Sequence, residues 1–318
     1  MKSIFLMRKK YVIIKLMKVL FIKRISSMIQ TQELSRLERR IKMALIQCNF
    51  FSSSLMRTVT INVILPIDKI VFPGQPKPEE KPFKTLYLMH GILGNYTDWV
   101  SGTRLQTWAQ DKNIAIVMPS GDNSFYVDKP VPGERYGTFI RKELVEFTRK
   151  SFPLSHKRED TFIGGLSMGG YGAIINGLMA PETFSVVCAL SAATIAGRIE
   201  HLIENSDNLF YSKEFFERVF GDPQKFIGSD HDYVTVAKKL AVSNNQKPKI
   251  FMACGYDDNL FESNQLFKDQ LQSLNFEVTW IEDQGKHNWD FWNKYIEKFL
   301  HWLPLDEAVA GVSSGNVG

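Results

Sequence analysis

The chain has 318 residues, a length that suits one large α/β domain or two small ones. Its formal net charge is +5, from 39 Lys and Arg against 34 Asp and Glu, but residues 1–42 hold 12 of the basic residues and only two of the acidic ones. Residues 43–318 therefore carry 27 basic and 32 acidic residues, a balance that argues against a nucleic-acid-binding face. With 44% apolar and 12% aromatic residues, the composition is that of a chain with a sizeable core and excludes a disordered one.

Residues 1–42 form a basic leader in which Lys15 and Lys18 interrupt the apolar stretch Tyr11–Ile22. A secretory signal needs an uninterrupted apolar run of about 7–15 residues, and a membrane-spanning helix needs about 20. The leader fits neither, although a basic amphipathic helix lying on an anionic membrane stays open. We favour translation that begins at Met43, because Arg39–Lys42 can be encoded as AGG-AGG-AUU-AAA, a ribosome-binding sequence directly before a start codon.

Seven segments of strand length are predicted after the leader. Arg57–Leu65 alternates apolar and polar residues, which is typical of an antiparallel strand with one buried face. The other six are more continuously apolar, as strands buried on both faces of a parallel sheet are. These six are Thr85–Met89, Ile114–Met118, Thr161–Ile163, Phe184–Leu190, Lys249–Ala253 and Glu277–Ile281.

Helical patterns lie between these strands. They are Thr103–Lys112, Gly137–Lys150, Met168–Met179, Leu260–Leu274 and Trp289–Leu303. Alternating strands and helices predict an α/β fold, a doubly wound sheet with helices on both faces. Residues 194–245 break the alternation and predict a helical cap, inserted above the carboxyl edge of the sheet. Residues 304–318 are small and polar after Pro304, and we expect a flexible tail there.

The three cysteines, Cys48, Cys188 and Cys254, are too few and too widely spaced for a disulfide framework or a cysteine-based zinc site. Cys188 and Cys254 lie in apolar runs, where buried free thiols are expected. This usage favours a reducing compartment, so the sequence predicts a cytoplasmic protein. The chain contains no His-x-x-x-His pair and no dinucleotide fingerprint, and we therefore expect neither a metal nor a cofactor.

A candidate nucleophile stands in the pentapeptide Gly165-x-Ser167-x-Gly169. The bare pattern arises often by chance, but here an apolar strand precedes it and an apolar helix follows it, the context that a nucleophile elbow requires. Such a turn forces the serine into a strained conformation and leaves no room for side chains on either side. The sequence therefore predicts that Ser167 projects above the sheet at a helix N-terminus.

A serine nucleophile needs a base, and the base needs a carboxylate that orients it. In this fold the chain order is serine, acid, histidine, which eliminates the two histidines before Ser167. Of the four later histidines, two lie in the predicted cap and one lies near the end of an apolar helix, which leaves His287. The acid should follow the preceding strand, where Asp257 and Asp258 are adjacent. We prefer Asp258, with Asp257 as a helix cap or a supporting partner.

An oxyanion hole requires backbone N–H groups that point at the charge developing on the substrate oxygen. One donor is expected from Met168, the residue after the nucleophile. The other is expected from the loop His90-Gly-Ile-Leu-Gly94, where Ile92 is the first choice and Leu93 the second. His90 is predicted to bond within this loop and not to act as a base.

We expect the acyl pocket at the carboxyl edge of the sheet, between the elbow, the loop 90–95 and the cap. Bulky residues crowd these segments, and Trp289, close to His287, is predicted to bind substrate. In the cap, the bulky residues expected at the pocket are Phe210, Phe215, Phe216 and Phe220. Such a pocket favours small acyl groups.

From Met43 to about Leu303 the sequence resembles the esterase D and S-formylglutathione hydrolase-like group of the α/β-hydrolase superfamily, and within it the tributyrin esterases. The resemblance lies in five blocks that occur in the same order, an opening strand pair ending in Asn62–Pro66, then Tyr87–Trp99, Gly165–Ala173, Gly255-x-x-Asp258 and Gly285–Trp292. It implies an α/β-hydrolase fold, with the nucleophile, acid and base at Ser167, Asp258 and His287. Residues 1–42 lie outside it.

The resemblance implies hydrolysis of short-chain acyl esters by a serine carboxylesterase that needs no cofactor. S-formylglutathione hydrolases, feruloyl esterases and acetyl-carbohydrate esterases belong to the same group, so these substrates stay open. The expected partner is a small-molecule ester, with no nucleic acid, and with membrane contact only if the basic leader belongs to the protein. A homo-oligomer also stays open.

Overall fold

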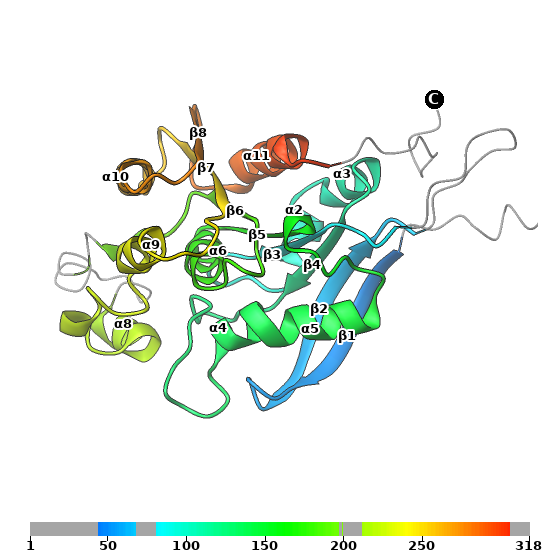
Figure 1. Cartoon of the computed structure of the whole chain (residues 1–318), viewed down its shortest axis with the longest axis horizontal. Helices are drawn as coiled ribbons and strands as arrows, with labels where there is room; N and C mark the ends of the chain where they lie inside the picture. Colours follow the sequence, from blue (N-terminus) through cyan, green and yellow to red (C-terminus); the bar gives the residue numbers. More distant parts are fainter. Residues whose placement is uncertain (1–43, 68–80, 197–198, 200–211, 306–318) are drawn as a thin grey trace, which may run out of the picture. The chain divides into compact units, whose positions relative to one another are not determined.

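The seven strands predicted from the apolar pattern and one more, β1, join into one eight-stranded sheet in the order β1-β2-β4-β3-β5-β6-β7-β8 (Figure 1). The computed structural model describes residues 44–67, 81–196, 199 and 212–305. β1 pairs antiparallel with β2, and β2 pairs antiparallel with β4, while all the other neighbours are parallel. The strands are β1 (Ala44–Ser52), β2 (Arg57–Leu65), β3 (Thr85–Met89), β4 (Ala115–Pro119), β5 (Thr161–Leu166), β6 (Val186–Leu190), β7 (Lys249–Gly255) and β8 (Val278–Asp283).

Helices cover both faces of this sheet (Figure 1). The α-helices are α2 (Asp98–Gly102), α3 (Leu105–Asp111), α4 (Tyr136–Thr138), α5 (Leu144–Ser151), α6 (Met168–Met179), α8 (Lys213–Phe220), α9 (Tyr233–Ala241), α10 (Phe261–Ser273) and α11 (Trp289–Trp302). Short turns of other helix types are the π-helical turn Phe139–Glu143 and the 3₁₀ turns Arg158–Asp160 and Pro223–Lys225. Apolar side chains of α2, α3 and α11 pack on one face, and those of α5, α6 and α10 pack on the other. The expected α/β fold class, with helices on both faces of a mostly parallel sheet, is confirmed.

The helix that follows the predicted elbow is the most deeply buried one. Every residue of α6 from Met168 to Leu178 is buried, as expected for a helix that is apolar on all sides. The sheet covers one side of α6, and α9, which follows β6, covers another. This packing holds the first turn of α6 rigidly at the carboxyl edge of β5.

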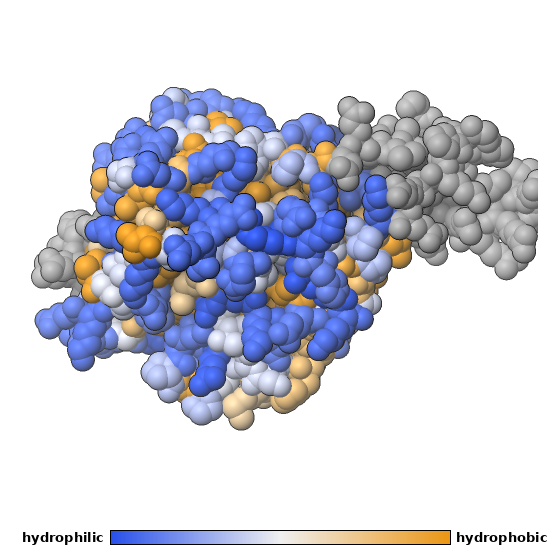
Figure 2. Space-filling model, viewed as in Figure 1, coloured by the Kyte–Doolittle hydropathy of each residue, from blue (hydrophilic) through white to orange (hydrophobic). Residues whose placement is uncertain are grey.

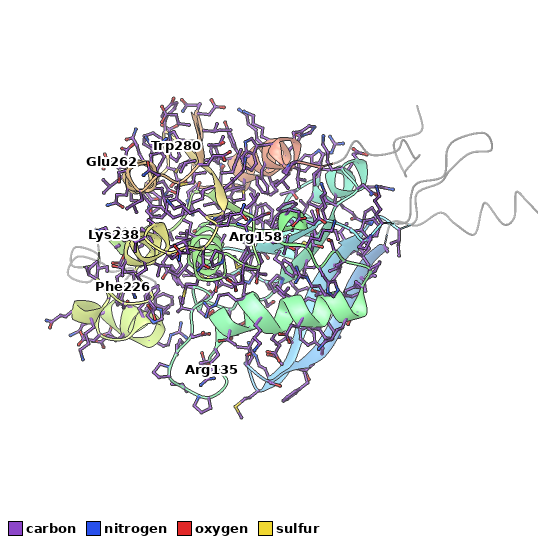
Figure 3. The ribbon with its side chains drawn as sticks, viewed as in Figure 1. Arg135, Arg158, Phe226, Lys238, Glu262 and Trp280 are labelled. Atoms are coloured by element: carbon purple, nitrogen blue, oxygen red, sulfur yellow. The ribbon has the colours of Figure 1, made fainter. Side chains whose placement is uncertain are left out.

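The predicted cap contains α8 and α9 between β6 and β7. Phe226, labelled in Figure 3, is 1% exposed and packs its ring against Phe216 and Phe220 of α8. The cap phenylalanines that were expected to line a pocket are therefore largely packed against one another. Phe210 lies outside the described residues, as do the leader 1–42 and all but the first two residues of the tail.

Four details of these elements differ from the prediction. β2 is buried on both faces over its last five residues, because β4 and β1 flank it and helices cover it. β8 was expected to be buried on both faces, but it is an edge strand with no buried residue. The helix predicted as Gly137–Lys150 contains the π turn, and α2 was not predicted. Cys188 and Cys254 are buried free thiols, as expected.

The surface of the described residues is mostly hydrophilic on the face that Figure 2 shows, with hydrophobic residues scattered over it. In the described part of the chain, no helix combines the length and the apolar character needed to cross a membrane.

Candidate active site

Ser167 stands at the sharp turn between β5 and α6, with a φ of 52° and a ψ of −118°. This left-handed φ is strained for a serine. Its amide donates to the carbonyl of Leu190 over 2.9 Å, which ties the turn to β6. A Cβ at Gly165 would collide with the backbone of Gly169 and Met89, so the helix and the neighbouring strand approach too closely for any other residue. The turn therefore has the geometry that the Gly-x-Ser-x-Gly pattern predicts.

The side chains of Ser167, His287 and Asp258 form one hydrogen-bonded line. The distance from Ser167 Oγ to His287 Nε2 is 3.0 Å, and that from His287 Nδ1 to Asp258 Oδ2 is 2.9 Å. Because the carboxylate can only accept, Nδ1 carries the proton and Nε2 is free to accept the serine hydroxyl proton. The His287 side chain is 31% exposed, so a substrate can reach the nucleophile. This arrangement can activate a serine hydroxyl.

Asp258, and not its neighbour Asp257, faces the imidazole. The Asp258 side chain is fully buried, and its Oδ1 accepts the amide N–H of Leu260 over 2.9 Å. Burial alone would raise the pKa of this carboxyl, but the hydrogen bonds from His287 and Leu260 and the charge of His287 lower it below the ordinary value. Asp257 is exposed, and its carboxylate accepts a hydrogen bond from Gln284.

Backbone hydrogen bonds join the loop that carries Asp258 to the loop that carries His287. Tyr256 N–H donates to Asp283 O over 2.9 Å, and Asp257 N–H donates to Gly285 O over 3.0 Å. These bonds continue the pairing of β7 with β8 beyond the strands. His287 therefore sits at a fixed height above the sheet, although its strand lies at the edge.

His90 organises the loop that was predicted to supply an oxyanion donor. Its ring is buried, and Nε2 accepts the amide N–H of Gly121 over 2.9 Å. Nδ1 must therefore carry the proton and donate to Gly91 O, 2.6 Å away. Burial lowers the pKa of His90, so the ring stays neutral. The predicted structural role of His90 agrees with these contacts.

The orientation of one peptide bond distinguishes Ile92 from Leu93. His90 Nδ1–H bonds Gly91 O, so this carbonyl points toward the His90 ring. In a trans peptide the N–H lies opposite the carbonyl, so the N–H of Ile92 points away from the His90 ring. The loop passes directly over the elbow, since a Cβ on Gly91 would lie 3.6 Å from Ser167 Cβ. The amide of Leu93 already donates to Asn123 Oδ1 over 2.8 Å, which leaves Ile92 as the better candidate.

The amide of Met168, the other predicted donor, opens α6 directly after the nucleophile. Within the described residues, neither this N–H nor that of Ile92 donates to another group. The first amides of a helix have no partner in the helix itself, and they point toward the positive end of its dipole. These two free N–H groups next to Ser167 can donate hydrogen bonds to a negatively charged oxygen.

A second loop, Ser120–Tyr126 after β4, supports the oxyanion loop and was not identified from the sequence. The Tyr126 hydroxyl donates to His90 O over 3.0 Å, and Asn123 accepts from Leu93. Tyr126 has a φ of 57°, and two other non-glycine residues of this loop also have positive φ. The sequence pattern that could have identified this loop is the run Gly121-Asp-Asn-Ser124 after an apolar strand. This run indicates a turn, but it does not indicate that the turn contacts the loop 90–94.

Trp289 was predicted to bind substrate, but the structure packs it between two helices. Its ring meets Trp99 of α2 at 5.4 Å and Trp292 of α11 at 5.3 Å, and it lies against Gly102. The ring that contacts the imidazole of His287 edge-on is that of Trp292, at 5.0 Å. These contacts favour a packing role for Trp289 over the predicted role in substrate binding.

The sheet order and the Ser167–His287–Asp258 geometry define the class of protein, a serine hydrolase with an α/β fold. Residues 52–303 match the model of the family described as "Putative esterase". The chain belongs to this esterase family.

Individual relatives agree with this assignment. The acetyl esterase of Caldicellulosiruptor saccharolyticus is 44% identical over 261 residues, which cover 82% of this chain and 98% of that one. FphF, a fluorophosphonate-binding serine hydrolase of Staphylococcus aureus, superposes with a TM-score of 0.72 at 30% identity, over 83% of this chain and 99% of FphF. The S-formylglutathione hydrolase FrmB of the same organism gives 0.70 at 30% identity, over 82% and 99%. The protein is a carboxylic ester hydrolase.

Proposed function

We propose that this protein hydrolyses short-chain acyl esters, as tributyrin esterases do, through an acyl-enzyme formed on Ser167. The observation that carries the proposal is the line of hydrogen bonds from Ser167 Oγ through His287 to the buried carboxylate of Asp258. In this proposal Ser167 is the nucleophile, His287 is the general base and acid, and Asp258 orients the imidazole. The amides of Met168 and Ile92 form the oxyanion hole.

In the first half of the reaction, Ser167 Oγ attacks the ester carbonyl carbon while His287 Nε2 takes the hydroxyl proton. The carbonyl oxygen becomes negatively charged and lies between the two amides, which are already oriented before the substrate arrives. Asp258 stabilises the protonated imidazole through Nδ1–H. His287 then gives its proton to the departing alcohol, and the acyl group remains on the serine.

In the second half, a water molecule takes the place of the alcohol. His287 removes a proton from the water, the hydroxide attacks the acyl carbon, and the proton returns to Ser167 Oγ as the carboxylic acid leaves. The enzyme is restored without any net redox change. Both halves use the same three side chains, so the loss of any one of them slows both.

Two observations support a short acyl group. Beyond the first turn of α6, the rings of Phe125, Tyr171 and Phe220 fill the space with centroid separations of 5.0–5.7 Å. Each methylene of a substrate gains about 0.8 kcal/mol while it can be buried, and this gain is lost once the chain meets a wall of this kind. In addition, the relative with 44% identity is named an acetyl esterase.

The second candidate is an S-formylglutathione hydrolase, because FrmB covers nearly the same residues at 30% identity. The same catalytic groups would serve that thioester, so only the substrate distinguishes the two functions. Feruloyl and acetyl-carbohydrate esters require a larger site on the acyl or on the alcohol side, respectively.

The nucleophile is tested with Ser167→Ala and a fluorophosphonate probe. Activity on p-nitrophenyl butyrate should fall by several orders of magnitude, and the probe should label Ser167 in the wild type, as seen by peptide mass spectrometry. Ser191→Ala is the matched control for the labelling, because that serine also has a left-handed φ, of 46°, but is fully buried. Activity of Ser167→Ala above about a hundredth of the wild type would contradict the assignment.

The substrate class is tested with p-nitrophenyl esters from C2 to C12 and with S-formylglutathione. We expect kcat/KM to rise from acetyl to about butanoyl and to fall steeply by octanoyl. A maximum at C8 or longer would contradict the short-chain proposal. Fast hydrolysis of S-formylglutathione with weak activity on butanoyl esters would instead favour the second candidate.

A further inference from the structure

Asn264, in the first turn of α10, is a fully buried amide whose oxygen and NH₂ group both bond backbone atoms. Its helix is marked by the neighbouring Glu262 in Figure 3. Oδ1 accepts the N–H of Ala192 over 3.1 Å, and Nδ2 donates to the carbonyls of Ala192 and Leu260 over 2.7 and 2.8 Å. A buried amide in this state is costly to displace, because any movement leaves polar groups unpaired.

The partners of Asn264 lie next to the two ends of the proposed catalytic line. On one side, Ala193, which follows Ala192, donates its N–H to Ser167 O over 3.0 Å. On the other side, Leu260 donates its N–H to Asp258 Oδ1 over 2.9 Å. The bonds through Asn264 and those through His287 therefore form two separate routes between the nucleophile and the acid. The second route passes through no reacting group.

The turn that Asn264 holds is itself strained. Ser191 is fully buried with a φ of 46°, and its N–H donates to Ala253 O over 2.8 Å. A left-handed conformation at a non-glycine residue costs free energy, and it persists only where surrounding contacts hold it in place. The two bonds from Asn264 to the adjacent Ala192 provide that constraint. The Ser191 hydroxyl itself has no hydrogen-bond partner among the described residues, so backbone bonds hold this turn and the serine side chain does not.

We propose that Asn264 is a positioning residue of the reaction, which fixes the separation between the Ser167 turn and the Asp258 carboxylate. This inference rests on the proposed function of Ser167, Asp258 and His287. Without the Ala192 bonds, Thr194 Oγ1 still donates to Ser263 Oγ over 2.9 Å and Ser191 N–H to Ala253 O, but the turn after β6 loses its two bonds to the amide beside the Asp258 loop and can shift relative to it. A displacement of about 1 Å in such a line is enough to cost around a hundredfold in rate.

The test uses Asn264→Ser and a matched control on another helix. A serine inside a helix donates to the carbonyl four residues back, so this variant keeps the Leu260 bond and removes both bonds to Ala192. Thr148 of α5 is equally buried and donates in the same way to Leu144 O, four residues back, over 2.8 Å, while its hydroxyl also bonds the Tyr87 hydroxyl over 2.8 Å. Thr148→Val therefore removes buried hydrogen bonds in a helix that contributes no group to the proposed site.

For Asn264→Ser we expect kcat on p-nitrophenyl butyrate and the rate of fluorophosphonate labelling to fall by about ten- to a hundredfold. KM should stay within about twofold, since acylation and deacylation slow together. Thr148→Val should lose a similar amount of stability in urea but keep kcat within about threefold. A merely structural Asn264 would give the same kinetics in both variants, and this result would overturn the proposal.

Asn264→Asp is the second variant, in case the serine variant does not fold. The carboxylate has the size of the amide and keeps the acceptor for Ala192 N–H, but it loses both donated bonds, so the same loss of kcat is expected at pH 8. Failure of both variants to fold would assign Asn264 to folding and overturn the proposal. Ser167→Ala, assayed alongside, separates the two claims. If it stays active, the proposed function fails, and if it is inactive while both Asn264 variants keep wild-type kcat, only this inference fails.

Discussion

Replacing Asp258 with asparagine should reverse the tautomer of His287. In the wild type, Oδ1 accepts from Leu260 N–H while Oδ2 accepts from His287 Nδ1–H. In Asp258→Asn, the amide oxygen must stay with Leu260 N–H, because an NH₂ group there would face another donor. The NH₂ group then faces His287 Nδ1, which has to accept. The imidazole proton moves to Nε2, the atom that lies 3.0 Å from Ser167 Oγ.

With its proton on Nε2, the imidazole cannot remove the proton of the serine hydroxyl. The wrong tautomer costs about 10⁴ in kcat in serine hydrolases of this kind, which corresponds to about 5 kcal/mol of barrier. The substitution is nearly isosteric and keeps the Leu260 hydrogen bond, so the variant should fold. We expect kcat on p-nitrophenyl butyrate at pH 8 to fall by about 10⁴, with little change in melting temperature.

Asp257→Asn is the matched control, since it makes the same chemical change one residue away. Asp257 is exposed and bonds only Gln284 through its side chain in the described residues, so less than a tenfold loss is expected. Both variants should be assayed by stopped flow, with folding checked by circular dichroism. The reverse ranking, or an Asp258→Asn enzyme with more than about a hundredth of the wild-type kcat, would refute the reasoning.

Two further predictions concern pKa shifts. Burial lowers the pKa of His90 below its ordinary value of 6.5, so its contribution to stability is complete above about pH 6.5 and is lost as the pH falls toward the folded-state pKa. Urea unfolding at pH 5.0 and 7.5 should therefore show a smaller pH dependence in His90→Gln than in the wild type or in the exposed control His156→Gln, and an equal dependence would contradict the prediction. Burial also raises the pKa values of the Cys188 and Cys254 thiols. Iodoacetamide should label Cys48 first in the native protein, and native labelling of Cys254 would contradict this expectation.

The fold was predictable where local signals were strong. β3 and α6 have the predicted limits, because an apolar run bounded by clear turn residues fixes both ends. The position of each strand within the sheet could not be predicted in this way. It decides how deeply the strand is buried, and it depends on neighbours that are distant in sequence. β8 has an apolar pattern much like that of an inner strand, yet it lies at the edge. The π turn within the predicted helix 137–150 has no propensity signal of its own.

The candidate site likewise contains residues with a clear sequence signal and residues without one. Ser167, Asp258 and His287 could be selected by chain order, because each follows a strand of a sheet whose carboxyl ends share one edge. Tyr126, which bonds the predicted oxyanion loop, and Asn264, which we propose as a positioning residue, contact groups 36 and 72 positions away. Their sequence signal is indirect. An asparagine in a helix interior is locally unfavourable, and both Asn176 and Asn264 offset that cost with buried backbone hydrogen bonds.

The two candidates for the oxyanion donor illustrate what a pattern alone leaves undetermined. Ile92 and Leu93 are adjacent apolar residues in one loop, and no spacing rule distinguishes them. The decisive contacts come from outside the loop, because the Gly121 amide fixes the tautomer of His90 and Asn123 binds the Leu93 amide. A neutral His90 then binds Gly91 O, and the planar trans peptide turns the Ile92 N–H away from the His90 ring. The choice of donor therefore depends on the loop after β4, which carries none of the reacting groups.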